Sequence, residues 1–432
     1  MAGDHIGRLI EGSWPDPDGG ASIGVATRAV VIEPSLAGDE ADLVATLGLG
    51  KVFAVVSDPQ TREVLGARVE RALASLGVVV PVVLDAHPHA DAETAAAVAR
   101  ASAKTDVIVA VGSGTINDVC KHAAAQTGKP YVVFATAASM NGYTSSNAAI
   151  TVNGHKKSLA CKPAQGVFMD IEVLSAAPLR MVRAGLGDSL CRTTAQTDWL
   201  MSHLLRQTEY RTAPFALLAP DEPVLLEHSD ALVMGDGEAM RHLARTLVLS
   251  GFGMSICRGS YPASQGEHLI SHYLDTMLAG RGDGFLHGEQ VAVATLTMAR
   301  IQERLLADGA PSVAASRATR DTVVQRFGEP AGGECWDEFE PKRLSQAAAE
   351  RLNQHMALNW SDLARRIEAV HISSHTLEKA LSRAGAPTRT NDIGVSPADY
   401  EAAVYGARYL RDRFTFLDLA DDAGRLEEIW RG

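Results

Sequence analysis

The sequence predicts an α/β domain with a parallel sheet, followed by an all-α domain. Three observations support this: apolar runs alternate with helical segments up to about residue 178, helical patterns dominate afterwards, and 432 residues exceed one ordinary core. Uninterrupted apolar strands separated by amphipathic helices are typical of a sheet that is covered on both faces. We therefore expect a loose N-terminal arm over 1–25, an α/β domain over 26–178 and a helical domain over 179–432.

The individual elements follow from local patterns. Runs of β-branched and other apolar residues predict strands over 52–56, 78–84, 106–111 and 131–134. Amphipathic patterns between them predict helices over 61–76, 91–104 and 115–126. Residues 144–170 are expected to be extended or a hairpin, with a turn at Asn153-Gly154. Later helices are expected over 187–205, 238–251, 265–279, 288–306, 342–355, 375–384 and 397–412.

Charge and cysteine usage exclude several classes of protein. The formal net charge of −12 argues against a nucleic-acid-binding or membrane-surface protein, although an anionic substrate still needs a local basic pocket. Five scattered cysteines without a CxxC pair indicate no disulfide framework and a reducing cytoplasm. We expect no signal peptide and no membrane insertion, because no apolar run is long enough. Candidates for the basic pocket are Lys156, Lys157, Lys162 and Arg258.

A glycine-containing turn follows the strand predicted at 106–111. Gly112 and Gly114 let the backbone bend sharply and let a phosphate come close, and the next helix N-terminus offers free N–H groups. Asp118 lies in the first turns of that helix, where a carboxylate either fixes the turn or binds a ribose hydroxyl. Because position 117 is Asn and no third glycine is present, a plain strand-to-helix turn explains this motif alone equally well.

A second small, polar loop follows the strand predicted at 131–134. It reads Thr136-Ala-Ala-Ser139-Met-Asn141-Gly-Tyr-Thr-Ser145. Open α/β sheets bind ligands at the carboxyl ends of their strands, which favours a ligand-binding loop. Considered by itself, a solvated loop with Ser and Thr bonded to the backbone is the simpler interpretation.

Three separate segments together supply the ligands of a possible metal site. Asp188 follows Gly185 and Gly187, His268 and His272 are four residues apart on one helical face, and His287 begins another helix. One carboxylate and two imidazoles suit a divalent cation such as zinc and leave a position open for substrate. Because the chain has fourteen histidines, a pair at this spacing also arises by chance.

These motifs, in this order, resemble the bacterial branch of the sn-glycerol-1-phosphate dehydrogenase family. That family belongs to the superfamily of metal-dependent alcohol dehydrogenases, glycerol dehydrogenases and dehydroquinate synthases. The resemblance extends from about residue 51 to the C-terminus, and its combination of motifs is specific although no single motif is. The matching segments are Gly112-Ser-Gly-Thr-Ile-Asn-Asp118, Thr136 to Ser145, Lys157-Ser-Leu-Ala-Cys-Lys162-Pro, Gly185-Leu-Gly-Asp188, Ser264-Gln-Gly-Glu-His268-Leu-Ile-Ser-His272, His287-Gly-Glu-Gln290 and Tyr409-Leu-Arg-Asp-Arg-Phe-Thr-Phe-Leu-Asp-Leu.

The resemblance implies a Rossmann-like sheet within a dehydroquinate synthase-like architecture, and it assigns ligands. Asp188, His268 and His287 would bind one divalent metal. The iron-using relatives have a fourth ligand, a histidine, four residues after the aspartate; here that position is Arg192, so zinc is expected, with nickel as the alternative. NAD(P) would be held by Gly112, Gly114, Thr115, Ile116, Asn117, Asp118, Thr136, Ala137, Ala138, Ser139 and Ser145.

The resemblance also implies an activity, the interconversion of dihydroxyacetone phosphate and sn-glycerol 1-phosphate by hydride transfer, as part of phospholipid metabolism. Asp188 and His272 would be catalytic, with His272 relaying a proton or, alternatively, only orienting substrate or His268. Substrate contacts would come from Asn141, Asp188 and His272. The family has Asp at the position of Asn141, and an amide cannot act as an anionic base, so this change leaves the exact substrate open.

Three alternatives stay open at this point. A dehydrogenase for an unphosphorylated polyol and a lyase similar to dehydroquinate synthase would use the same nucleotide and metal. A non-catalytic nucleotide-binding paralogue is the alternative outside the enzyme class, suggested by Asn141. In each case we expect a homo-oligomer.

Overall fold

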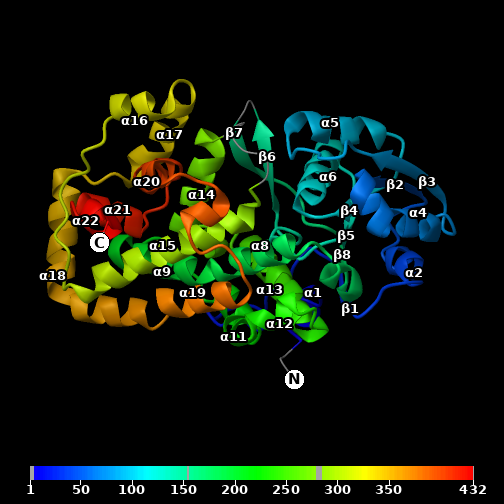
Figure 1. The fold of residues 1–432 in the computed structure, drawn as a ribbon, viewed down its shortest axis with the longest axis horizontal. Coiled ribbons are helices and arrows are strands. Elements are labelled where there is room, and N and C mark those ends of the chain that lie inside the picture. Colours follow the sequence, from blue (N-terminus) through cyan, green and yellow to red (C-terminus); the bar gives the residue numbers. More distant parts are fainter. Residues whose placement is uncertain (1–3, 153–154, 279–284, 432) are drawn as a thin grey trace. The chain divides into compact units, whose positions relative to one another are not determined.

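The computed structural model describes residues 4–152, 155–278 and 285–431 (Figure 1). Contacts within the chain divide it into two compact units. The first unit is Met1–Ser189 with Thr212–Ser260 and contains the parallel sheet; the second is Leu190–Arg211 with Tyr261–Gly432 and is helical. Residues 212–260 thus group with the sheet, because their longest helix, α13 (Gly237–Ile256), packs against the first strand and against α7 (Ile171–Ser175).

The six-stranded sheet of the first unit is entirely parallel. Its strand order is β1-β8-β5-β4-β2-β3, and Figure 1 shows these strands side by side. The four strands predicted from apolar runs are confirmed, with small changes at their ends, as β2 Val52–Ser57, β3 Val78–Val83, β4 Val107–Gly112 and β5 Tyr131–Ala135. The sheet also contains β1 Ala29–Glu33, which was not predicted, and β8 Gly166–Asp170.

Helices cover both faces of this sheet. Val107, Val109 and Val111 of β4 join one apolar cluster with residues of α2 and α4. The residues between them, Ile108 and Ala110, are also fully buried, as expected for a doubly covered parallel strand. The remaining helical segments of this unit are α1 His5–Ile10, α2 Glu40–Ala45, α3 Pro59–Thr61, a π-helical turn Arg62–Gly66, α4 Ala67–Leu73, α5 Ala92–Ala101, α6 Gly114–Thr127, α8 Leu179–Leu190, α10 Ala213–Leu218, α11 Glu222–Glu227 and α12 Ser229–Val233.

The N-terminal segment is better ordered than the loose arm that the sequence indicated. Helix α1 buries Leu9 completely, and Trp14 is buried as well. Trp14 Nε1 donates to His5 Nδ1 at 2.8 Å, and the Asp18 carboxylate accepts from the backbone N–H of Thr212. The many Gly, Asp and Pro residues of this segment obscured a short helix whose two buried residues, Ile6 and Leu9, are three apart.

The prediction that residues 144–170 are extended or a hairpin is confirmed, although it did not say which part forms a hairpin and which joins the parallel sheet. Strands β6 (Asn147–Val152) and β7 (His155–Ala160) form an antiparallel hairpin, and the predicted Asn153-Gly154 turn lies outside the described residues. Residues Gly166–Asp170 are instead a fully buried parallel strand between β1 and β5. A short apolar run suits either a hairpin or a parallel sheet, so its partners decide.

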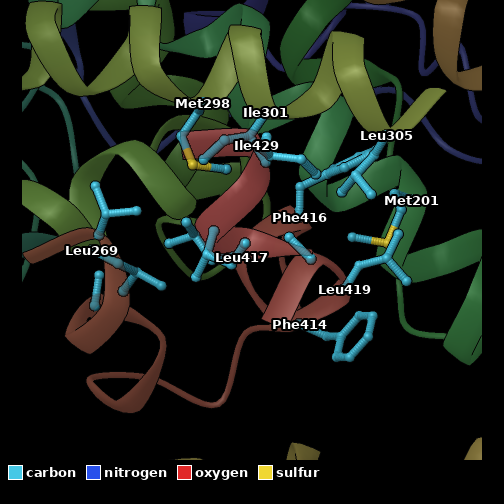
Figure 2. Packing of buried hydrophobic residues seen from close by; sticks show 14 of the residues in the cluster. Met201, Leu269, Met298, Ile301, Leu305, Phe414, Phe416, Leu417, Leu419 and Ile429 are labelled. Carbon is cyan, nitrogen blue, oxygen red and sulfur yellow. The ribbon is translucent and has the colours of Figure 1, made fainter. Parts of the chain in front are cut away.

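The second unit is built from helices around a large apolar core, and a smaller apolar cluster contains Val323, Trp336 and Phe339. Figure 2 shows Met298, Ile301 and Leu305 packing near Phe416 and Leu417, which are distant in sequence. The predicted helical character is confirmed, and further short helices join those that the sequence indicated. The segments are α9 Arg192–Arg206, a 3-10 turn Tyr261–Ala263, α14 Gly266–Met277, α15 His287–Ala307, α16 Arg320–Phe327, α17 Ala331–Phe339, α18 Gln346–Glu368, α19 Ser374–Arg383, α20 Pro397–Gly406, α21 Phe416–Asp422 and α22 Leu426–Arg431, with 3-10 turns at Glu340–Lys342, Thr390–Ile393 and Ala407–Tyr409.

Two sequence expectations concern the whole chain. All five cysteines are free thiols. Within the part of the chain that the structure describes, no helix combines the length and the apolar character that crossing a bilayer requires.

Candidate active site

The glycine turn lies at the carboxyl end of β4 and leads directly into α6. A Cβ atom at Gly112 would stand 2.6 Å from Ile116 Cδ1, and one at Gly114 would stand 3.0 Å from Met140 Cγ. Side chains at these two positions would therefore push the helix start and the following loop away. The glycines keep the N-terminal turn of α6, with Thr115 in it, accessible at the sheet edge.

Behind this turn, Asp118 and Lys121 form a buried polar network. Asp118 Oδ1 accepts from Asn117 Nδ2 at 2.9 Å, and Oδ2 accepts from the N–H of Ala149 in β6 at 3.0 Å. Lys121 is fully buried, and its Nζ lies 3.9 Å from Asp118 Oδ1. Burial raises the pKa of Asp118, whereas burial lowers the pKa of Lys121. Both carboxylate oxygens of Asp118 accept hydrogen bonds from the protein, which favours the role of fixing the turn over that of binding ribose.

Lys121 also ties the second predicted loop to α6. Its Nζ donates to Gly142 O at 2.5 Å, to Ser145 Oγ at 3.1 Å and to Asn147 O at 3.0 Å. Sequence analysis missed this lysine. The available signal was its position three residues after Asp118, which places both side chains on one helical face.

The second loop begins where β5 ends. Thr136 donates its backbone N–H to Gly112 O at 3.2 Å, which joins the loop to the glycine turn. Ala137 O accepts from the buried Tyr143 hydroxyl at 2.6 Å. Thr136, Ala137 and Ala138 are buried, and Ser139 is half-buried. The loop is therefore a packed structure, in contrast to the solvated loop of the alternative interpretation.

Helix α8 brings Asp188 against this loop. A Cβ at Gly185 would lie only 1.8 Å from Ala138 O, so glycine is required for the close approach. One turn later, Asp188 Oδ2 accepts from the Asn141 N–H at 2.8 Å, and Asp188 is only 1% exposed. Asn141 is buried too, and its Nδ2 has no hydrogen-bond partner among the described residues. The loop and the carboxylate thus meet at Asn141.

Three histidines gather within the helical unit. His268 and His272 lie on one face of α14, and His287 is the first residue of α15. The ring centroids are 5.0 Å apart for His268 and His287, 5.7 Å for His272 and His287, and 5.9 Å for His268 and His272. At its N-terminal end, α14 is held by the buried Asp198, whose Oδ2 accepts from the Gly266 N–H at 3.0 Å.

The Nδ1 atoms of two of these histidines have close polar neighbours that sequence analysis missed. His268 Nδ1 lies 3.0 Å from Glu267 Oε1, and His287 Nδ1 lies 3.3 Å from Ser271 Oγ. Glu267 is fully buried. Glu267 and Ser271 both lie in the same segment as His268 and His272, but the sequence alone did not show that they contact the histidine rings.

Two groups of described residues carry possible metal-ligand atoms. The first is Asp188, in the sheet-containing unit, with His268 and His287 of the helical unit; the second is Cys191, Glu267 and His268, whose ligand atoms lie within 4.8 Å of one another. The first group has the donor types of a catalytic zinc site, in which three protein ligands leave one position open. This chemistry fits a divalent cation.

The residue at the fourth-ligand position and the cations proposed to bind phosphate differ in burial. Arg192 is buried at the start of α9, its Nη1 donates to Gln196 Oε1 at 2.6 Å, and burial lowers its pKa to about 10. Of the possible phosphate-binding cations, Lys156 and Lys157 are half-buried in β7, whereas Lys162 and Arg258 are exposed.

Comparison with known proteins places the chain in a family. A family model described as iron-containing alcohol dehydrogenase matches residues 31–178. A glycerol-1-phosphate dehydrogenase of Pyrococcus furiosus, named for NAD(P)+, is 33% identical over 295 residues, which cover 66% of this chain and 84% of that protein. The chain belongs to the glycerol-1-phosphate dehydrogenase family. It is therefore an oxidoreductase, and the resemblance found in its motifs is confirmed.

A further relative agrees with this assignment, and solved structures share the fold. A glycerol-1-phosphate dehydrogenase of Bacillus subtilis is 30% identical over 322 residues, covering 74% of this chain and 70% of that protein. The structure of an NADH-dependent butanol dehydrogenase from Thermotoga maritima has a TM-score of 0.61 at 14% identity, covering 95% of this chain and 97% of that one. A probable glycerol dehydrogenase from Sinorhizobium meliloti has a TM-score of 0.60 at 19% identity, covering 94% and 98%. The structural likeness confirms the predicted fold class.

Proposed function

We propose that this member of the glycerol-1-phosphate dehydrogenase family interconverts dihydroxyacetone phosphate and sn-glycerol 1-phosphate, using NAD(P) and one divalent cation. The observation that carries the proposal is the pair His268 and His287, whose ring centroids are 5.0 Å apart, in a chain of this family that also has Asp188. A carboxylate and two imidazoles with an open fourth position suit a Lewis acid for a carbonyl. The four motif positions Asp188, His268, His272 and His287 also argue against a non-catalytic paralogue.

On the cofactor side, the proposal assigns different tasks to different residues. Backbone N–H groups around Gly114 and Thr115 would receive the pyrophosphate at the start of α6. Thr136 and Ser139 would line the neighbouring edge. Asp118 and Ser145 would shape the site from behind, because their oxygens bond to protein groups. The remaining proposed members of this set are Gly112, Ile116, Asn117, Ala137 and Ala138.

On the substrate side, His272 is the proposed proton relay and Asn141 a substrate contact. When bound, the dinucleotide supplies the hydride and the cation polarises the carbonyl. His272 is partly exposed, with 23% of its side chain accessible, so it can exchange a proton with water. The Asn141 amide would donate its Nδ2–H to a substrate oxygen, a role that the usual carboxylate of the family could not take.

We propose zinc as the cation, with nickel as the alternative, because Arg192 stands where a fourth histidine ligand occurs in iron-using relatives. A buried guanidinium at that position supplies positive charge and no ligand. We further propose that the enzyme works in the cytoplasm, which the free thiols of all five cysteines support, and that it forms a homo-oligomer.

The test combines metal content with turnover. Asp188→Ala and His268→Ala should lose zinc on gel filtration and lose reduction of dihydroxyacetone phosphate, while His375→Ala, at an exposed histidine of α19, should keep both. Metal is measured by mass spectrometry and turnover by absorbance of the reduced cofactor. Normal turnover of either site variant in the presence of chelator would overturn the metal mechanism.

A substrate panel separates the alternatives. The proposed enzyme reduces dihydroxyacetone phosphate and not dihydroxyacetone, with NADH or NADPH. Preference for the unphosphorylated ketone would indicate a polyol dehydrogenase. Conversion of substrate without net change in the cofactor would indicate a lyase of the dehydroquinate synthase type.

A further inference from the structure

The protonation of His268 follows from the residue that its Nδ1 faces. Glu267 Oε1 lies 3.0 Å from that nitrogen and also accepts from the Gln265 N–H at 2.7 Å. The Thr194 hydroxyl lies 3.2 Å from the second carboxylate oxygen, Oε2. An ionised carboxylate offers only acceptors, so the proton between the two residues belongs to His268 Nδ1. The lone pair of the neutral ring is then on Nε2.

The protonation of His287 follows from a different argument. Ser271 Oγ lies 3.3 Å from His287 Nδ1, and it donates to Gln290 Oε1 at 2.7 Å. A hydroxyl has a single proton, which this second bond uses. Ser271 must therefore accept from His287 Nδ1–H, and His287 also has its lone pair on Nε2.

We propose that Glu267 and the Ser271–Gln290 pair are positioning residues that hold His268 and His287 as Nδ1–H tautomers before any cation arrives. The inference rests on the proposed function, in which these two rings bind the cation through Nε2. Groups that bond to the second nitrogen of a ligating imidazole fix its tautomer and orientation and raise its basicity.

The two positioning contacts are unequal. Glu267 presents a fully buried carboxylate to the ring, whereas Ser271 presents a hydroxyl. A charged acceptor forms the stronger hydrogen bond and adds more electron density to the ring. Glu267 therefore sets more of the affinity for the cation than Ser271 does. Because Glu267 also belongs to the second group of possible ligands, with Cys191, the proposal assigns its carboxylate to the imidazole and not to a metal.

The first measurement reads the tautomers directly in the metal-free protein. Histidine labelled with 15N distinguishes the two ring nitrogens by NMR at about pH 8. Wild type should show Nδ1–H for His268 and His287. Glu267→Leu should change the tautomer signature of His268 alone, and Ser271→Ala that of His287 alone. His242, whose Nδ1 contacts Asp221 at 2.7 Å in the other unit, should stay unchanged in every variant.

The second measurement is zinc affinity by competition with a chelator. Glu267→Leu should weaken zinc binding by roughly 10- to 100-fold, the usual effect of losing such a contact. Glu267→Gln, which keeps the size and one acceptor oxygen, should lose less and should retain the Nδ1–H signature. Ser271→Ala should lose less than Glu267→Leu. Asp198→Asn is the matched control, since it removes another buried carboxylate, from α9, that accepts from Gly266 N at the start of α14 and contacts no histidine.

Two results would overturn the inference. One is a His268 that keeps its Nδ1–H signature in Glu267→Leu; the other is wild-type zinc affinity in that variant. Retention of zinc by His268→Ala would instead overturn the proposed ligand set, so the two failures are distinguishable. If Glu267→Leu does not fold, the same comparison is made with Glu267→Gln, where unchanged zinc affinity contradicts the role of the charge.

Discussion

The glycine turn and the histidine cluster use polar groups in opposite ways. Around the turn, the charged side chains bond inward: Asp118 accepts from Ala149 N–H, and Lys121 donates to Gly142 O and Ser145 Oγ. Backbone N–H groups and the space left by glycines are what this region offers a ligand. In the cluster, by contrast, the histidine side chains themselves are the proposed binding groups.

This difference teaches where each region is sensitive. A site made from backbone depends on loop position, so residues that never touch a ligand control it. A site made from imidazoles depends on which ring nitrogen is protonated, so single hydrogen bonds control it. Substitutions in the first region should therefore alter stability and cofactor binding together, whereas those in the second should alter metal binding with less effect on folding.

The comparison is tested most severely at Lys121. Lys121→Met removes one hydrogen-bond donor from each of three acceptors and leaves Asp118, only 15% exposed, without its cation. We expect a loss of about 4 kcal/mol in the free energy of unfolding, typical of breaking a buried ion pair. Urea denaturation measures this loss, and a cofactor titration should show weaker binding in parallel.

The double variant Lys121→Met/Asp118→Asn supplies the control for this prediction. Neutralising Asp118 removes the unpaired charge, so the second substitution should recover part of the lost stability. Additive losses would contradict the coupling between these two residues.

A second test concerns the approach of α8 to the loop. Gly185→Ala places a methyl group 1.8 Å from Ala138 O, where backbone stands on both sides and neither can yield easily. We expect a loss of about 3 kcal/mol, as for severe overpacking. Turnover should fall roughly 100-fold because Asp188 moves with its helix.

The matched control is Gly237→Ala in α13 of the same unit. There the added methyl group would be 3.6 Å from Ile171 Cγ2, an ordinary contact. Denaturation and turnover of this variant should equal or exceed those of wild type. Equal behaviour of the two glycine variants would show that the loop does not depend on close packing.

A third test concerns the pKa of a buried carboxylate in the helical unit, Asp198. Burial and then the nearby Glu267 raise the pKa of Asp198 to about 8. Between about pH 4 and pH 8 the folded protein therefore holds a proton that the unfolded chain has released, and stability falls as pH rises through this range. Asp198→Asn cannot titrate, so its Tm should fall less than that of wild type from about pH 5 to pH 8, as calorimetry can measure. If Tm falls equally with pH in Asp198→Asn and in wild type, the raised pKa of Asp198 is contradicted. Asp362→Asn is the control at an exposed position, and its Tm should follow that of wild type.

The smallest effect is expected at Asp106, which precedes β4 at the end opposite the glycine turn. Its Oδ2 accepts from Lys51 N–H at 2.8 Å and from Val52 N–H at 3.0 Å, and these two bonds lower its pKa. The stability that they add is present above about pH 4 and is lost as pH falls. Asp106→Asn should lower Tm slightly at pH 7, not at pH 3, and leave the cofactor Kd unchanged. Weaker cofactor binding by Asp106→Asn would show that any loss of stability in this unit weakens binding at the glycine turn.

Some of the fold could not be predicted because the deciding partners are distant in sequence. The strand Gly166–Asp170 has the same short apolar pattern as a hairpin strand, yet it pairs with β1, which lies more than a hundred residues earlier. Strands β2, β3 and β4 were predictable because each is a six-residue run followed by a helical segment, and β5 was predictable from its apolar run alone. The N-terminal turn was missed because burial of Leu9 depends on packing, which a Gly- and Pro-rich segment does not indicate.

The sequence by itself determined the kinds of group available: a turn with glycines after a buried strand, and histidines four apart on one helical face. Both depend on neighbouring residues and on the regular periods of strand and helix. Only the tertiary structure decided how the polar atoms are used. Asp118 bonds to Ala149, and Ser271 links His287 to Gln290, across separations of sixteen residues or more. The physical reason is that a hydrogen bond depends on direction and distance between two atoms, and no pattern along one segment contains the position of the other.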